Sequence, residues 1–206
     1  MKSNAFFVMM IEKGKGGRIG LRKKIYTFFL ILCTITFLFC AWKLGQYLFA
    51  YHQADQEYQE IRKVGNTGND RKEIDFDGLR KMNSDTIGWI YMEGTEIDYP
   101  IVISHDNNEY LSRTFQGTSN RSGAIFMDKN CDKEFASDNS VIYGHHMRDG
   151  SMFADLLKFR EQSFINEEND VILYTPERTI PLKVIASYAA KGSTKIPIMF
   201  SDEGEK

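Results

Sequence analysis

The sequence predicts a mainly β domain, a small barrel or sandwich with short helices, behind an N-terminal transmembrane helix and a helical stalk. Three observations predict it: an apolar run near the N-terminus, an amphipathic stripe after that run, and short β-rich runs between turn signals from residue 87 onward. The 206 residues, 42% of them hydrophobic and 26% charged, suffice for one ordinary domain and an additional segment.

The apolar run covers 25–42 and reads IYTFFLILCTITFLFCAW, without a charge, Gly or Pro. As a helix it would be about 27 Å long, which is just enough to cross a bilayer. Its polar residues are Thr27, Thr34 and Thr36, whose hydroxyls can bond back to helix carbonyls. The run therefore predicts a single-pass anchor in the cell membrane.

The charge is distributed asymmetrically along the chain. Residues 1–24 carry a net charge of +6, and the remainder carries −8. The basic residues next to the span are Arg18, Arg22, Lys23 and Lys24. The positive-inside rule then predicts a cytoplasmic N-terminus and an extracellular domain. The acidic remainder argues against a nucleic-acid partner.

A cleaved signal peptide is the alternative interpretation of the apolar run. It requires a shorter apolar core and small residues at the cleavage site, whereas 37–42 is bulky. Two cysteines, Cys33 and Cys40, lie in the run, and Cys131 is the other thiol. An outer domain without a disulfide is ordinary for a Gram-positive surface protein.

A stalk is predicted over 46–64. Tyr47, Tyr51, Ala54, Tyr58 and Ile61 recur there at helical spacing, and we expect this stripe to pack on the following domain rather than form a coiled coil. The predicted organisation is a basic cytoplasmic tail (1–24), an anchor (25–42), a stalk with a linker at 65–70 (43–70) and a domain (71–206).

The predicted domain starts with a short helix over 75–82 that ends at Asn83. The predicted strands are 87–91, 96–103, 123–127, 140–144, 171–174 and 179–190. A hairpin turn at 92–95 joins the first two, and a helical turn is expected at 109–111. A further helix is expected at 151–157, with Ser151 as its N-cap.

The histidines are the main candidates for chemistry. His52 falls in the stalk and His105 in a polar loop, whereas His145 and His146 follow an apolar strand and Gly144. Catalytic groups concentrate where strands end in loops. Neighbouring residues on a strand point to opposite faces and no third ligand is evident, so no metal site is expected.

Four segments together resemble the class B sortases. These are NSDTIGWIYMEGTEIDYPIV (83–102), DNNEYLSRTF (106–115), GAIFMD (123–128) and VIYGHHMRDGSMFADL (141–156). The resemblance covers 75–200 and implies an eight-stranded closed β-barrel, of which about six strands would be present, with a membrane-anchored N-terminus and an outward-facing catalytic domain.

The resemblance implies a cysteine transpeptidase without a cofactor. Such an enzyme cleaves a C-terminal sorting signal of NPxTx type, holds the surface protein as a thioester and transfers it to a cell-wall amine. His145 matches the family's catalytic histidine, and Tyr143, Asn107 and Leu111 match substrate-binding positions. The implied partners are the sorting-signal peptide, a cell-wall precursor or peptidoglycan amine, and the membrane.

The family's catalytic cysteine and arginine belong to strands downstream of the residues present. Cys131 lies beside Asp128, Asp132 and Glu134, whose charges would disfavour a thiolate. Three hypotheses therefore stay open: a C-terminally truncated class B sortase that is inactive as written, a non-catalytic membrane-tethered peptide-binding module, and an unrelated enzyme that uses Cys131 and His145.

Overall fold

The computed structural model describes residues 16–65, 73–166, 171–188 and 190, and their side chains except those of 16–22 and 165–166. The predicted linker from residue 66 onward, most of the basic tail and the last residues of the chain lie outside the described residues. The chain divides into two compact units, Met1–Leu48 and Phe49–Lys206.

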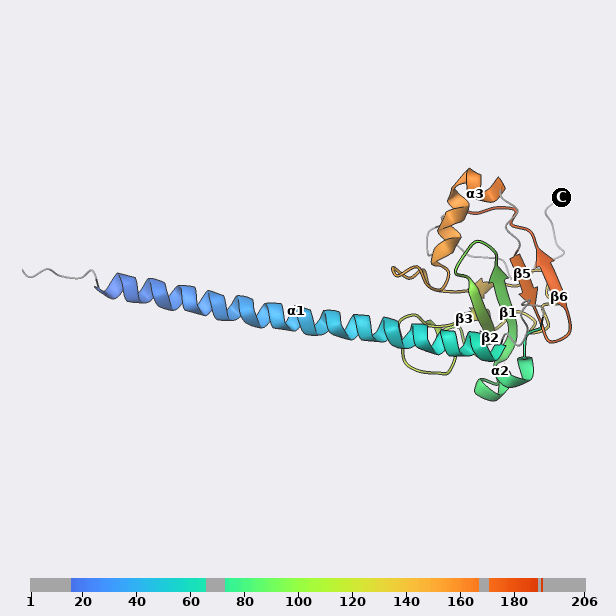
Figure 1. The fold of residues 1–206 in the computed structure, drawn as a ribbon, viewed down its shortest axis with the longest axis horizontal. Helices are drawn as coiled ribbons and strands as arrows, with labels where there is room; N and C mark the ends of the chain where they lie inside the picture. Colours follow the sequence, from blue (N-terminus) through green and yellow to red (C-terminus); the bar gives the residue numbers. More distant parts are fainter. Residues whose placement is uncertain (1–15, 66–72, 167–170, 189, 191–206) are drawn as a thin grey trace, which may run out of the picture. The chain divides into compact units, whose positions relative to one another are not determined.

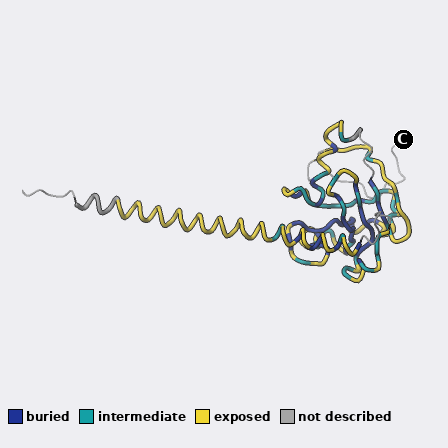
Figure 2. The backbone as a smooth tube through the Cα atoms, viewed as in Figure 1, coloured by how far each residue is buried: buried dark blue, intermediate teal, exposed yellow. Residues whose placement is uncertain are grey.

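Helix α1, Gly16–Gly65, is one uninterrupted helix where the sequence predicts an anchor followed by a stalk. Figure 2 shows its residues exposed throughout the first unit wherever they are described. The hydroxyls of Thr27, Thr34 and Thr36 each donate to the carbonyl four residues earlier at 2.9 Å, as predicted. The helix is long and apolar enough to cross a membrane, which suits an anchor or a signal sequence.

The end of α1 belongs to the second unit and packs on it. Ala54, Tyr58 and Ile61 are buried, which confirms the predicted stripe there, whereas Tyr47 in the first unit is 45% exposed. The Tyr58 hydroxyl donates to the carbonyl of Gly123 at 2.9 Å. The stalk is thus part of the hydrophobic core of the domain.

Helix α2, Phe76–Met82, confirms the predicted short helix. The Asp75 carboxylate caps it by accepting from the backbone N–H of Gly78 at 2.8 Å. Asn83 ends it, donating its backbone N–H to Leu79. Strand β1 begins three residues later.

Six strands form one mixed sheet (Figure 1). They are β1 (Thr86–Met92), β2 (Asp98–Ile103), β3 (Ile125–Met127), β4 (Ile142–Tyr143), β5 (Val171–Tyr174) and β6 (Thr179–Leu182), in the order β4-β3-β2-β1-β5-β6. Strands β2 and β3 pair in parallel, and every other pair is antiparallel. β1 is buried along most of its length, with Trp89 1% exposed, as expected of a central strand.

All six predicted strands are present, but β6 is shorter than predicted. It ends at Leu182, and residues 183–188 form no regular structure. Ile185 is 94% exposed, so the apolar, β-branched sequence there does not produce a strand without a pairing partner within the described residues. Strands β4 and β6 are the two edges of the described sheet, and closure into a barrel stays a prediction.

The helical segments after β4 also differ from the prediction. The expected helix at 151–157 is instead a 3-10 helix, η2, over Ala154–Arg160, followed by α3 over Gln162–Asn166. Ser151 is not its cap: the N-cap position is Phe153, which makes no side-chain hydrogen bond to the helix, and the Ser151 hydroxyl donates to the carboxylate of Asp149 at 2.7 Å. The predicted turn at 109–111 is confirmed as the 3-10 helix η1, Glu109–Leu111.

Candidate functional site

Asp128 lies at the centre of a polar cluster directly after β3. Its carboxylate is almost fully buried, at 2% exposure of the residue. Oδ2 accepts from Asn107 Nδ2 at 2.8 Å and from the Tyr143 hydroxyl at 2.9 Å. Oδ1 accepts from the backbone N–H of Asn130 at 2.9 Å and from its Nδ2 at 3.0 Å. One side chain therefore joins the 104–108 loop to β4.

The hydrogen bonds decide the charge states in this cluster. Burial alone would raise the pKa of Asp128, but the bonds from Asn130, Tyr143 and Asn107 hold that pKa below its usual range. Burial, together with the bond to Asp128 and its charge, raises the pKa of Tyr143 to about 12. At neutral pH the pair is thus an ionised acceptor and a protonated donor.

The amide of Asn107 is held at both ends. Its Nδ2 donates to Asp128, and its Oδ1 accepts from the backbone N–H of Lys129 at 2.9 Å. The next turn is fixed by Asp106, whose Oδ1 accepts from the backbone N–H groups of Asn108 and Glu109. The Asn107 side chain is consequently oriented by the two residues that follow β3, Asp128 and Lys129, rather than by its own loop alone.

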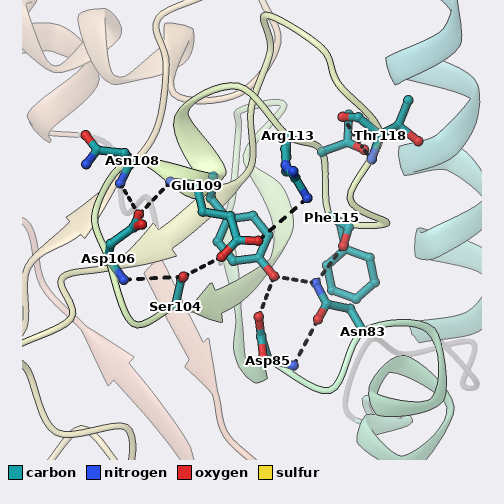
Figure 3. A network of polar contacts seen from close by, with 11 residues as sticks. Asn83, Asp85, Ser104, Asp106, Asn108, Glu109, Arg113, Phe115 and Thr118 are labelled. Carbon is teal, nitrogen blue, oxygen red and sulfur yellow. Dashed lines mark hydrogen bonds and ion pairs between the residues drawn. The ribbon is translucent and has the colours of Figure 1, made fainter.

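Helix η1, which carries Leu111, is held in place by the hydrogen-bond network in Figure 3. The Tyr110 hydroxyl donates to Asp85 Oδ2 at 2.7 Å and accepts from Asn83 Nδ2 at 2.9 Å. On the other side, Ser104 donates to Glu109 Oε2 at 2.6 Å. Leu111 itself is 43% exposed, so this framework presents an apolar side chain to solvent.

His145 packs against η1. Its Nε2 lies 2.7 Å from the backbone carbonyl oxygen of Leu111. Two glycines permit this approach. A Cβ on Gly144 would lie 2.5 Å from Ile125 Cδ1, and a Cβ on Gly123, where φ is +60°, would lie 2.5 Å from the carbonyl oxygen of Tyr110. The missing side chain of Gly144 thus leaves room for Ile125 and Phe153.

His146 contacts a different part of the domain. Its backbone forms an isolated bridge with Met152, and its side chain is exposed. It lines a cavity of about 440 Å³ together with Phe153, Leu157 and Tyr188. The two neighbouring histidines therefore have different surroundings. The His145 ring contacts η1, whereas His146 lines the 440 Å³ cavity.

The remaining candidates are two histidines and a cysteine. Of these, Cys131 adjoins the Asp128 cluster, because its backbone N–H donates to the carbonyl oxygen of Asp128 at 2.9 Å. His105 and His52 are exposed, as expected. Cys131 is buried, and its Sγ accepts from the backbone N–H of Val141 at 3.4 Å. Among the residues that the structure describes, no group of three or more His, Cys, Asp or Glu side chains could hold a metal ion.

The structure thus brings the four predicted site residues into two linked pairs. Asn107 and Tyr143 meet on Asp128, and Leu111 and His145 meet at the η1 carbonyl. Sequence reasoning missed Asp128 as the centre of the site. The available signal was an acid directly after the apolar run GAIFM, at the end of a strand.

Comparison with known proteins decides the family. Sortase B of Listeria monocytogenes is 40% identical over 135 residues, which are 63% of this chain and 55% of that protein. The crystal structure of sortase B from B. anthracis in complex with AAEK1 matches with a TM-score of 0.68 at 30% identity, over 75% of each chain. The chain belongs to the sortase B family. No protein-family model matches it.

Sortase B enzymes form a Gram-positive transpeptidase family that anchors surface proteins to the cell wall. The chain spans just over half the length of the Listeria monocytogenes sortase B. A Staphylococcus aureus sortase B–substrate complex matches with a TM-score of 0.59 at 25% identity, over 78% of this chain and 71% of that one. A sortase B with this fold has therefore been seen with its substrate.

Proposed function

We propose that this chain binds a C-terminal sorting signal of NPxTx type at Asn107, Leu111, Tyr143 and His145, as part of the sortase B transpeptidation of surface proteins. The observation that carries the proposal is the buried Asp128 carboxylate, which holds Asn107 and Tyr143 in one fixed arrangement. The sortase B–substrate complex of Staphylococcus aureus supports it by relationship.

Each side chain has a distinct part in this proposal. Leu111 offers apolar surface to the peptide, and Asn107 and Tyr143 shape the polar wall beside it. His145 handles the proton of the leaving amine and later that of the entering amine. In the family reaction a thiolate attacks the scissile carbonyl, the amine leaves with a proton, and an acceptor amine of the cell wall then displaces the thiol.

The thiols of this sequence limit what the chain does by itself. Cys33 and Cys40 lie on the apolar part of α1, and Cys131 is buried against the backbone of Asn139 and Val141. A buried thiol that is held by backbone hydrogen bonds is a poor nucleophile. We propose that the 206-residue polypeptide binds the peptide without cleaving it. A non-catalytic, membrane-tethered peptide-binding module is the alternative that the same observation favours.

The proposed location is the cell membrane, with a single span, the N-terminus in the cytoplasm and the domain outside. Two features support this location and orientation: the exposed apolar surface of α1, and the Lys/Arg residues that precede the apolar run 25–42. Protease added to intact protoplasts should remove the domain beyond about residue 45, whereas full protection would contradict the orientation.

Peptide binding tests the functional proposal directly. The full chain in detergent micelles should bind a fluorescent NPxTx peptide, measured by anisotropy, at least tenfold more tightly than a scrambled peptide. Asn107→Ala should weaken binding about tenfold. Asn108→Ala is the matched control, since its side chain is exposed, and should leave binding unchanged. Equal affinity for both peptides would overturn the proposal.

A further inference from the structure

A second cavity, of about 550 Å³, lies between the stalk part of α1 and the segment 149–158. We call it the stalk cavity. It contains none of the residues assigned above to peptide binding. Its lining residues are Tyr51, His52, Ala54, Asp55, Tyr58, Arg62, Glu96, Tyr99, Ser122, Asp149, Gly150, Ser151, Met152, Asp155 and Lys158.

The charge of this lining is unbalanced. Four carboxylates face two fixed cations, Arg62 and Lys158. Both cations are already engaged: Lys158 pairs with Asp155 at 2.9 Å, and Arg62 donates to the carbonyl of Asp98 at 3.0 Å while it stacks on Tyr99. The other three carboxylates of the lining are those of Asp55, Glu96 and Asp149.

Those three carboxylates have no cationic partner in the described part of the chain. Asp55 accepts from the neutral amide of Gln59, and Asp149 accepts from Ser151. The Glu96 carboxylate has no hydrogen-bond partner among the described residues, and the backbone N–H of Glu96 donates to Asp155. The cavity therefore presents negative charge that the described residues do not neutralise.

Ser122 provides an independent sign of a missing ligand. It lines the cavity, is 2% exposed, and its Oγ has no hydrogen-bond partner among the described residues. Buried hydroxyls are normally paired. Among the nearby tyrosine hydroxyls, that of Tyr58 donates to the carbonyl of Gly123 and that of Tyr99 accepts from the backbone N–H of Met152.

The composition of the lining indicates the kind of ligand. A metal ion needs several ligands converging on one point, and within the described residues no three such side chains do so. The walls also include the rings of Tyr51, Tyr58 and Tyr99. Carboxylates beside aromatic side chains suit an organic cation, whose charges and hydrocarbon body need different contacts.

We propose that the stalk cavity binds an organic cation bearing primary amines, held by the carboxylates of Asp55 and Asp149, with the hydroxyl of Ser122 accepting from an N–H group. The proposal goes beyond the peptide-binding function and does not depend on it. Occupancy would join the stalk to the segment whose Phe153 N–H donates to the carbonyl of His145 at 2.9 Å.

Calorimetric titration of the full chain in uncharged detergent micelles tests this site with 1,5-diaminopentane as the probe. We expect saturable binding that 1,5-pentanediol and glutarate do not reproduce. Asp55→Asn and Asp149→Asn should each weaken binding about tenfold. Asp138→Asn is the matched control, since Asp138 is exposed and does not line the cavity, and should leave binding unchanged.

Several results would overturn the proposal. These are absent or non-saturable diamine binding, equal binding of the diol, tighter binding of glutarate, or an equal loss in Asp138→Asn. Ser122→Ala should weaken diamine binding several-fold with an unchanged near-ultraviolet circular dichroism spectrum, and full affinity would contradict the part assigned to the hydroxyl. Peptide anisotropy measured on Asp55→Asn keeps this test separate from that of the proposed function.

Discussion

His145 Nε2 and the carbonyl oxygen of Leu111 lie 2.7 Å apart, which is a short hydrogen bond between residues 34 positions apart in the sequence. A carbonyl oxygen only accepts, so Nε2 must carry the proton. The contact thereby links His145 to η1, which presents the apolar side chain of Leu111. It also leaves Nδ1 as the basic nitrogen of the neutral ring.

The tautomer of His145 is the first prediction. Nitrogen-15 spectra of the full chain labelled at histidine should show His145 protonated at Nε2 when neutral, because only that tautomer can donate to Leu111. The His145 signals are assigned as those that are missing from the spectrum of His145→Gln. Exposed His146 serves as the comparison and should show the ordinary mixture of tautomers. A His145 protonated at Nδ1 would contradict the observed contact.

Asp128→Asn should destabilise the domain in a pH-dependent way. The charged carboxylate accepts four hydrogen bonds, so we expect a loss of about 2 kcal/mol in the free energy of unfolding at pH 7. Because the folded-state pKa of Asp128 is depressed, its contribution is complete above the ordinary value of 3.8 and is lost as the pH falls through the lower folded value.

Denaturant unfolding followed through the fluorescence of buried Trp89 measures this difference. The gap between the wild type and Asp128→Asn should be largest near neutrality and should shrink below about pH 3.8. Asp138→Asn, at an exposed position, should show almost no effect. A gap that stays constant down to pH 3 would mean that the charge of Asp128 does not stabilise the fold.

The hydroxyl of Tyr143 gives the third prediction. Its pKa of about 12 depends in part on the charge of Asp128, so Asp128→Asn should lower it toward the ordinary value of 10. Carbon-13 spectra of ring-labelled tyrosine, assigned with Tyr143→Phe, report this titration. An unchanged Tyr143 pKa in Asp128→Asn would show that burial alone raises it.

The stalk should contribute to the stability of the domain. Ile61 is fully buried, and Ile61→Ala should lower the free energy of unfolding by about 3 kcal/mol through lost burial and a cavity. Val64 on the same helix is 37% exposed, and Val64→Ala should cost less than about 0.5 kcal/mol. If both substitutions had equal small effects, the stalk would not belong to the folded core.

Much of this architecture can be predicted from local pattern. The spacing of Ala54, Tyr58 and Ile61 determines which face of the stalk is buried. The β-rich runs locate every described strand, and apart from the end of β6 they do so within a few residues. The resemblance to class B sortases also selects side chains that the structure brings together at Asp128 and at the η1 carbonyl.

The sequence-based predictions differ from the structure where residues distant in the sequence determine the local conformation. Residues 183–188 have strand propensity but find no neighbour in the described sheet, so β6 stops at Leu182. Ser151 has the right residue type for an N-cap, but η2 begins three residues later, at Ala154, and Phe153 occupies the cap position. Asp128 resembles an ordinary loop acid until Asn107 and Tyr143 are seen to converge on it.

Photo-crosslinking to the full chain tests the central claim, that an NPxTx peptide binds beside η1 and His145, most directly. The peptide carries a photoreactive residue at the x between Pro and Thr, and the linked residues are identified by mass spectrometry. We expect crosslinks within 107–111 and 143–145 that excess unlabelled peptide suppresses and that Asn107→Ala reduces. Crosslinks concentrated around Ser122 and Asp149, or spread over the surface without competition, would contradict the account.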